Sequence, residues 1–181
     1  MSLEKISEQL KQTELSGEKK MPPVELWDPP YCGEIDLQIK ADGQWFYNGT
    51  VFKRISLVKL FASVLKKEDE EYFLVTPVEK VKINVEEAPF VITQWSWQDD
   101  KKTIMQLSTN LDDMFLLSKE HPLQISEQGD LCVTVRRNLV AKVHRNVYYQ
   151  WVNFAKEVTT QQGIALAIES AGEQFVLGYL E

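Results

Sequence analysis

The stretch from residue 22 to residue 50 restricts the fold of this chain more than any other. It reads PPVELWDPPYCGEIDLQIKADGQWFYNGT and begins with a segment that contains four prolines. Proline fixes φ and disfavours helix at the residue before it, so this segment is predicted to be extended. Apolar and polar side chains then alternate, interrupted by the turn signals Asp42-Gly43 and Asn48-Gly49. The stretch therefore predicts a rigid segment followed by a three-stranded meander that ends near Arg54.

A helix and further strands are predicted after the meander. An apolar stripe at helical spacing runs from Leu57 to Leu65, with Ser56 as its N-cap and Lys66-Lys67 at its C-terminus. Alternation and turn residues then predict strands at residues 72–75 and 78–85.

The second half of the chain is predicted to be rich in strands, with one long helix. Asn138 is expected to cap this helix, and Leu139, Val143, Val147 and Trp151 keep one of its faces apolar to about Val158. The strands are predicted at residues 90–97, 103–109, 114–117, 123–125, 131–136, 164–169 and 174–180.

Residues 1–21 are predicted to form an N-terminal arm. Leu3, Ile6 and Leu10 recur at the spacing of one helical face, which indicates a short amphipathic helix. Ser16–Lys20 is interpreted as a flexible linker.

An internal echo indicates a duplicated domain. Leu37-Gln38-Ile39 followed by Gly43 recurs 86 positions later as Leu123-Gln124-Ile125 followed by Gly129. A short strand, a polar connection, a long amphipathic helix and an apolar strand are predicted after the glycine of each copy. We therefore expect an α+β fold of two related β-meander-plus-helix halves, with an arm at 1–21, an N-terminal domain at 22–88 and a C-terminal domain at 89–181.

Charge and composition exclude several classes of function. The net charge of −7 argues against binding to a nucleic-acid polymer, because such binding depends on a basic surface. No apolar run approaches the ~20 residues that span a bilayer. Without an apolar signal-peptide region, Cys32 and Cys132 are expected to be reduced thiols in a cytoplasmic protein.

No sequence motif predicts a reaction or a cofactor. His121 and His144 are the only histidines, and neither has cysteines or paired carboxylates at metal-ligand spacing. The chain contains no G-x-S-x-G nucleophile elbow and no glycine-rich phosphate loop. We therefore predict a non-enzymatic protein, with any cofactor unknown.

Three features remain as candidates for binding a ligand. Trp45 and Tyr47 share one face of a strand, which fits either core packing or stacking on a planar ligand. Arg136 and Arg145 lie near the predicted second helix and are either solvated or bind phosphate. The polar side chains from Thr76 to Lys80 either cap strand ends or face a cleft.

Several blocks of sequence resemble one bacterial family, the domain of unknown function 1285. They include Pro22–Asp36 with its WDPPYCG core, Asp42–Tyr47, Leu60–Leu65, Tyr72–Lys80, Glu87–Pro89, Thr109-Asn110, His121–Leu123 and Arg145–Tyr149. The resemblance extends from about Pro22 to Val158. It implies a duplicated core with a C-terminal half similar to a pleckstrin-homology domain, and a role in signal transduction under oxidative stress.

The resemblance also implies a nucleotide-like ligand between the two domains. We then expect Trp27, Asp28 and Tyr31 at the rim of such a site, and Trp45 or Tyr47 stacked on a base. Phosphates would pair with Arg54, Lys80, Arg136 and Arg145, and the sugar or base edge would bind Thr76, Glu79 and Asn110. The alternative function is a protein–protein adaptor that uses its β-surface and its N-terminal helix to bind a protein partner.

Overall fold

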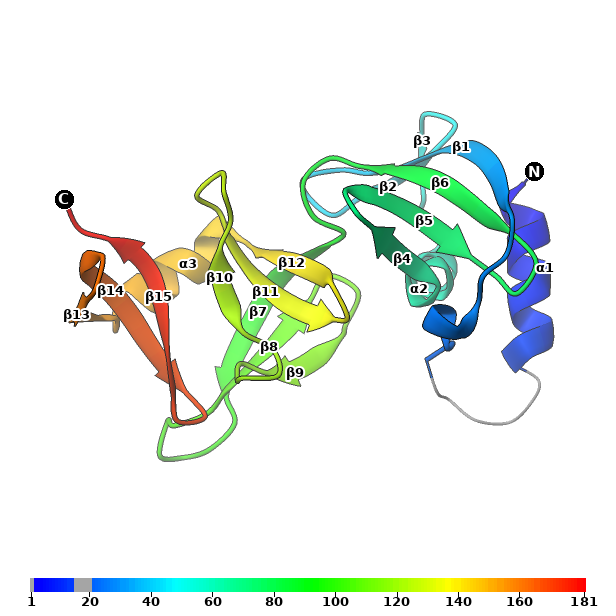
Figure 1. The fold of residues 1–181 in the computed structure, drawn as a ribbon. Helices are drawn as coiled ribbons and strands as arrows, with labels where there is room; N and C mark the ends of the chain where they lie inside the picture. The colour runs from blue at the N-terminus through cyan, green and yellow to red at the C-terminus, as the bar shows by residue number, and fades with distance from the viewer. Residues whose placement is uncertain (1, 15–20) are drawn as a thin grey trace. The chain divides into compact units, whose positions relative to one another are not determined.

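The computed structural model describes residues 2–14 and 21–181 (Figure 1). The chain divides into two compact units, Met1–Glu87 and Ala88–Glu181, called here the N-terminal unit and the C-terminal unit. Each unit contains its own set of buried apolar side chains. The linker predicted at Ser16–Lys20 lies outside the described residues.

The N-terminal unit is built on one six-stranded sheet with the strand order β3-β2-β1-β6-β5-β4. Its strands are β1 (Tyr31–Ile39), β2 (Trp45–Tyr47), β3 (Thr50–Val51), β4 (Leu65–Glu68), β5 (Glu71–Val75) and β6 (Lys80–Val85). Two antiparallel meanders, β1-β2-β3 and β4-β5-β6, join through the parallel pair β1 and β6. The meander predicted after the proline segment is confirmed.

The described residues of the N-terminal unit also form two α-helices and one 3-10 helix. They are α1 (Leu3–Glu14), η1 (Val24–Leu26) and α2 (Ile55–Ser63). The predicted amphipathic face of α1 is buried, with Leu3, Ile6 and Leu10 between 1% and 3% exposed. Helix α1 packs against α2. Isolated helices of this length are marginal in water, so this packing is what stabilises α1.

The C-terminal unit contains a second six-stranded sheet, with the order β10-β11-β12-β7-β8-β9. Its strands are β7 (Phe90–Trp97), β8 (Met105–Thr109), β9 (Met114–Leu116), β10 (Leu123–Ile125), β11 (Leu131–Arg136) and β12 (Leu139–Val143). Helix α3 (Arg145–Val152) follows, and then a three-stranded sheet of β13 (Lys156–Thr160), β14 (Gly163–Ser170) and β15 (Glu173–Tyr179).

The two six-stranded sheets share one topology, which confirms the predicted duplication. In each, two antiparallel meanders meet through a parallel pair: β1 with β6 in the first sheet, and β7 with β12 in the second. The position of the helix differs between the copies. Helix α2 connects the two meanders of its sheet, whereas α3 follows the second meander of its own.

The sequence echo has a more local origin than the duplication. Its two copies fall in the β1–β2 hairpin and in the β10–β11 hairpin, and shared topology equates β10 with β4 rather than with β1. Both hairpins close with the same turn. Gly43 and Gly129 each have φ of 87° and each donates to the carbonyl oxygen three residues earlier. The glycines recur because the fourth residue of this turn has a positive φ, which glycine adopts without strain.

The predicted long helix at 138–158 is wrong. The structure places β12, α3 and β13 there, and Leu139, Ala141 and Val143 form the buried face of strand β12. A four-residue apolar spacing fits a helix, but it is also a multiple of the two-residue strand period. The strand wins because β12 pairs with both β11 and β7. Asn138 belongs to the β11–β12 turn, and Arg137 there has a positive φ of 53°.

The ends predicted for the helix at residues 57–65 are also wrong. Arg54 rather than Ser56 occupies the N-cap position of α2, and the helix ends at Ser63. Lys66 and Lys67 lie in β4 because Leu65, which is fully buried, begins the pairing of that strand with β5.

Candidate functional site

A cleft in the C-terminal unit brings together cationic and aromatic side chains at the start of α3. Its volume is about 440 Å³. It is lined by Gly129, Asp130, Leu131, Lys142, Val143, Arg145, Tyr148 and Leu177, and it is called here the Arg145 cleft. The lining comes from the β10–β11 turn, the end of β12, the first turn of α3, and β15.

The junction of β12 and α3 fixes the cleft's cationic wall. The backbone N–H of His144 donates to the carbonyl oxygen of Ile92 at 3.0 Å, which extends the parallel pairing to β7. His144 then caps α3, because its Nδ1 accepts from the backbone N–H of Asn146 at 3.2 Å. Arg145 and Tyr148 follow at a separation of three residues, so they share one face of the helix. Both line the cleft.

The two cations of the cleft differ in whether a carboxylate pairs with them. Lys142 Nζ lies 3.2 Å from Asp130 Oδ1, so that lysine is largely neutralised within the wall. Arg145 is exposed, and its guanidinium has no ion-pair or hydrogen-bond partner within residues 2–14 and 21–181. It also lies at the positive end of the α3 dipole. The cleft therefore presents one uncommitted positive charge beside a tyrosine ring.

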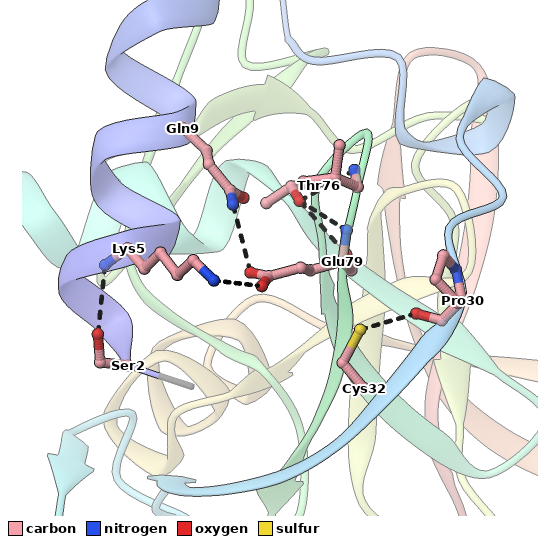
Figure 2. Close-up of polar contacts among 8 residues, drawn as sticks. Ser2, Lys5, Gln9, Pro30, Cys32, Thr76 and Glu79 are labelled. Carbon is pink, nitrogen blue, oxygen red and sulfur yellow. Dashed lines mark hydrogen bonds and ion pairs between the residues drawn. The ribbon is translucent and has the colours of Figure 1, made fainter.

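Two other residues predicted for the site, Thr76 and Glu79, contact each other in the N-terminal unit. Thr76, at 1% exposed, accepts from the backbone N–H of Glu79 at 3.0 Å through Oγ1. The Glu79 carboxylate in turn lies 3.4 Å from both Lys5 Nζ and Gln9 Nε2 of α1 (Figure 2). These contacts hold α1 in place. They also occupy the carboxylate, and the buried apolar face of α1 is not available to a protein partner.

Lys80 and Tyr31 of the same unit meet around Phe73. Lys80 Nζ lies 2.9 Å from Glu68 Oε2 and 5.1 Å from the centroid of the Phe73 ring. The hydrogen bond from Lys80 lowers the pKa of Glu68 below its ordinary value of 4.5, and Lys66 contributes in the same direction. The exposed ring of Tyr31 contacts Phe73 edge-on. Lys80 is thus already paired with a carboxylate.

The remaining predicted residues of the N-terminal unit differ in how far they are buried. Trp45 is 2% exposed and belongs to the core, so its ring is not accessible for stacking. Tyr47 is half-buried beside Phe52. Arg54 is exposed at the start of α2, and Trp27 and Asp28 lie just after η1, half-buried and exposed respectively.

Asn110 and Arg136 hold one corner of the second sheet. Asn110 Oδ1 accepts from the backbone N–H of Val91 at 3.0 Å. Arg136 Nη1 lies 3.2 Å from Asp113 Oδ1, and its guanidinium lies 4.8 Å from the centroid of the Phe90 ring. Burial lowers the pKa of Arg136, while Asp113 opposes that effect. Of the three predicted cations outside the Arg145 cleft, Lys80 and Arg136 are paired with carboxylates, whereas Arg54 has no such partner among residues 2–14 and 21–181.

Lys142, Tyr148 and Asp130 of the Arg145 cleft were not predicted from the sequence. Asp130 follows the turn glycine Gly129, but nothing in the sequence connects that turn to residue 145. The connection depends on the pairing of β11 with β12, in which Cys132 lies opposite Lys142. Because a long helix was predicted in place of β12, this pairing could not be predicted.

The described residues contain neither a metal-binding cluster nor a membrane-spanning helix. Within the described part of the chain, no group of three or more His, Cys, Asp or Glu side chains could hold a metal ion. No helix among the described residues is both long and apolar enough to cross a membrane.

Comparisons with known proteins agree on one family. Residues 22–88 match the N-terminal domain of DUF1285, a domain of unknown function, and residues 89–177 match the DUF1285 C-terminal domain. A crystal structure of a DUF1285 family protein from Silicibacter pomeroyi DSS-3 is 32% identical, has a TM-score of 0.79, and covers 94% of this chain and 95% of that one. A crystal structure of a DUF1285 family protein from Shewanella baltica OS155 is 32% identical, with a TM-score of 0.53, over 65% of this chain and 90% of that one. No curated protein matches this chain.

Proposed function

Because this chain belongs to the DUF1285 family, whose function is unknown, we propose a function from the geometry of its C-terminal unit. The protein is a non-enzymatic ligand-sensing module. It binds a small phosphorylated or nucleotide-like molecule in the Arg145 cleft.

The uncommitted guanidinium of Arg145 is the observation that carries this proposal. A planar guanidinium with several donors suits phosphate oxygens, and the first turn of α3 adds a favourable dipole. Elsewhere, Lys80 and Arg136 are paired with carboxylates. An anion entering the Arg145 cleft therefore meets a positive charge that no described side chain neutralises.

Tyr148 and the size of the cleft support a planar group on the ligand. The ring of Tyr148 is half-buried and lines the same wall as Arg145. A volume of about 440 Å³ falls in the range of ~300–1,000 Å³ typical of small-molecule sites. The overall charge of −7 opposes a nucleic-acid polymer, which needs an extended basic surface. A mononucleotide or a similar phosphorylated molecule fits these conditions.

Three wider features belong to the same proposal. Helix α3 after the last strand of the second sheet supports a pleckstrin-homology-like C-terminal unit. Cys32 and Cys132 form no disulfide, which supports a reducing, cytoplasmic location. Both thiols are half-buried. The mass gained at each cysteine after treatment with peroxide tests a signalling role under oxidative stress.

A thermal-shift screen tests the binding proposal. The full-length protein is heated with AMP, adenosine, ribose 5-phosphate and inorganic phosphate, and with no addition. A ligand at 100 times its Kd stabilises the folded state by about 2.7 kcal/mol, which is readily detected. We expect stabilisation by AMP that Arg145→Gln abolishes and that Arg54→Gln, an exposed arginine of the other unit, preserves. No stabilisation by any phosphorylated probe, or equal stabilisation of the Arg145→Gln protein, contradicts the proposal.

A further inference from the structure

A second cleft of the C-terminal unit combines an aromatic wall with charges of both signs. Its volume is about 320 Å³, and it shares no lining residue with the Arg145 cleft. Trp97, at the end of β7, and Phe154, after α3, supply its aromatic lining. Val158, Ala167 and Ile168 of the three-stranded sheet add apolar surface. We call it the Trp97 cleft.

The aromatic wall is held by contacts outside the cleft. The rings of Trp95, Trp97 and Phe154 form a triangle with centroid separations of 5.4, 5.4 and 5.5 Å. The indole N–H of Trp95 donates to Gln150 Oε1 of α3 at 2.8 Å. The wall therefore joins β7 to the region of α3. Such mutual support reduces the reorganisation needed when a flat ligand binds.

Four charged side chains around the Trp97 cleft are uncommitted. Lys102, Lys156, Glu157 and Glu169 line it, and none of their side chains has an ion-pair or hydrogen-bond partner within residues 2–14 and 21–181. A purely cationic ligand would be repelled by the two lysines, and a purely anionic one by the two glutamates. A ligand that carries both charges can satisfy one residue of each kind.

Two of the four charged side chains, Lys102 and Glu169, mark one end of the cleft. Lys102, Glu169 and Gln174 also line a neighbouring cavity of about 440 Å³, whereas Trp97 and Phe154 line only the first. A ligand with its ring against the two aromatic side chains would therefore direct its polar end toward Lys102 and Glu169. The volume of about 320 Å³ is near the small end of the ~300–1,000 Å³ typical of ligand sites, which suits one ring system and not a dinucleotide.

We infer that the Trp97 cleft binds an aromatic zwitterion, that is, an aromatic amino acid or a close derivative with an ammonium and a carboxylate group. The ring stacks against Trp97 and Phe154, where aromatic pairs prefer offset or edge-on contacts. The carboxylate pairs with Lys102 or Lys156, and the ammonium pairs with Glu157 or Glu169. This site is separate from the proposed site for phosphorylated ligands.

Three probes with the same indole ring separate the contributions of charge. L-Tryptophan carries both charges, tryptamine only the ammonium and indole-3-acetate only the carboxylate. Each is titrated into the full-length, ¹⁵N-labelled protein, and the Trp97 indole N–H resonance, assigned from the Trp97→Phe spectrum, reports binding. We expect L-tryptophan to bind about fivefold more tightly than either single-charge probe, since exposed ion pairs contribute modestly.

Charge-removing variants assign each half of the ligand without disturbing the aromatic wall. The double variant Lys102→Gln and Lys156→Gln should weaken the binding of L-tryptophan and indole-3-acetate but not the binding of tryptamine. Glu157→Gln with Glu169→Gln should weaken L-tryptophan and tryptamine but leave indole-3-acetate unweakened. Arg145→Gln should change none of the three, so a failed phosphate proposal would not affect this result. Absence of a shift at Trp97, equal affinities for the three probes, or insensitivity to both pairs of variants overturns the inference.

Discussion

Substitution of Ser170 tests most directly how the three-stranded sheet is attached to the rest of the C-terminal unit. The residue is fully buried at the end of β14. Its Oγ donates to the carbonyl oxygen of Leu117 at 2.7 Å and accepts from the backbone N–H of Met105 at 2.9 Å. One hydroxyl thus links β14 to two segments of the second six-stranded sheet and its flank. Ser170→Ala removes both bonds while leaving the backbone unchanged.

The expected loss follows from the two groups left behind. The Met105 N–H and the Leu117 carbonyl would each lose this partner in a buried position. An unsatisfied buried polar group destabilises by ~1–3 kcal/mol, and water that enters beside the smaller alanine offsets part of it. We expect Ser170→Ala to lower the free energy of unfolding of the C-terminal unit by about 2 to 4 kcal/mol.

Thr160→Ala is the matched control. Thr160 Oγ1 also donates to one backbone group, the Gly163 carbonyl at 2.9 Å, and accepts from another, the Gln162 N–H at 3.1 Å, but in an exposed turn. Water can replace these bonds, so its loss should stay below about 1 kcal/mol. The measurement is urea unfolding, together with hydrogen exchange of the Met105 amide. Equal losses in the two variants, or an unchanged Met105 exchange rate in Ser170→Ala, would refute the reasoning.

Three further predictions concern pH, backbone conformation and α1. Lys80 lowers the pKa of Glu68 in the folded state, so Glu68→Gln should cause its full loss of stability above the ordinary pKa of 4.5, and the loss should shrink as the pH falls through the lowered pKa. Urea unfolding at several pH values measures this loss, and a loss independent of pH would contradict the prediction. Gly172→Ala should destabilise by ~1–2 kcal/mol because φ is 77° in the β14–β15 turn, whereas Gly178→Ala on the same hairpin, with nothing within 4 Å of the added carbon, should not; similar losses on urea unfolding would contradict this. Ile6→Ala should release α1, because the residue is 1% exposed and the short helix depends on its packing; limited trypsin digestion should then cleave faster within α1, and unchanged cleavage would show that Ile6 does not hold it.

Local features of the fold were predictable wherever one residue type determines one geometry. Asn48 and Gly49 take the positive φ values of 50° and 76° that a tight hairpin turn needs, and the meander around them was predicted correctly. The last hairpin was predicted for the same reason, with positive φ at Ala171 and Gly172. In both places the turn residues and the alternation agreed with each other.

The region that builds the Arg145 cleft was not predictable, because its local pattern is ambiguous. The apolar residues from Leu139 to Trp151 fit one helix as well as they fit a strand followed by a helix. Pairing with β11 and with β7, where Ala141 lies opposite Phe90 51 positions earlier, settles the first part as a strand. Of the residues predicted for the site, Arg145 lines the cleft, but Lys142 and Asp130 could be connected to it only through the pairing of β11 with β12.

Both clefts depend on elements that distinguish the two copies of the duplicated sheet. The Arg145 cleft uses α3 and β15, and the Trp97 cleft uses β13, β14 and β15. In the N-terminal copy the helix comes between the meanders, and no described segment follows β6 within that unit to form a comparable second sheet. The difference explains how the C-terminal copy of one duplicated topology has two clefts that the shared topology alone does not provide.

Calorimetric titration with a matched pair of ligands tests the central claim most directly. AMP and adenosine differ only in the phosphate, so the ratio of their Kd values isolates the phosphate contribution. A charge-assisted hydrogen bond contributes about 1.5 to 3 kcal/mol, and each 1.4 kcal/mol corresponds to tenfold in Kd. The account predicts that AMP binds at least about tenfold more tightly than adenosine to the native protein, and that this advantage largely disappears in Arg145→Gln. An AMP advantage that survives in Arg145→Gln, or native protein that binds both ligands equally, would contradict it.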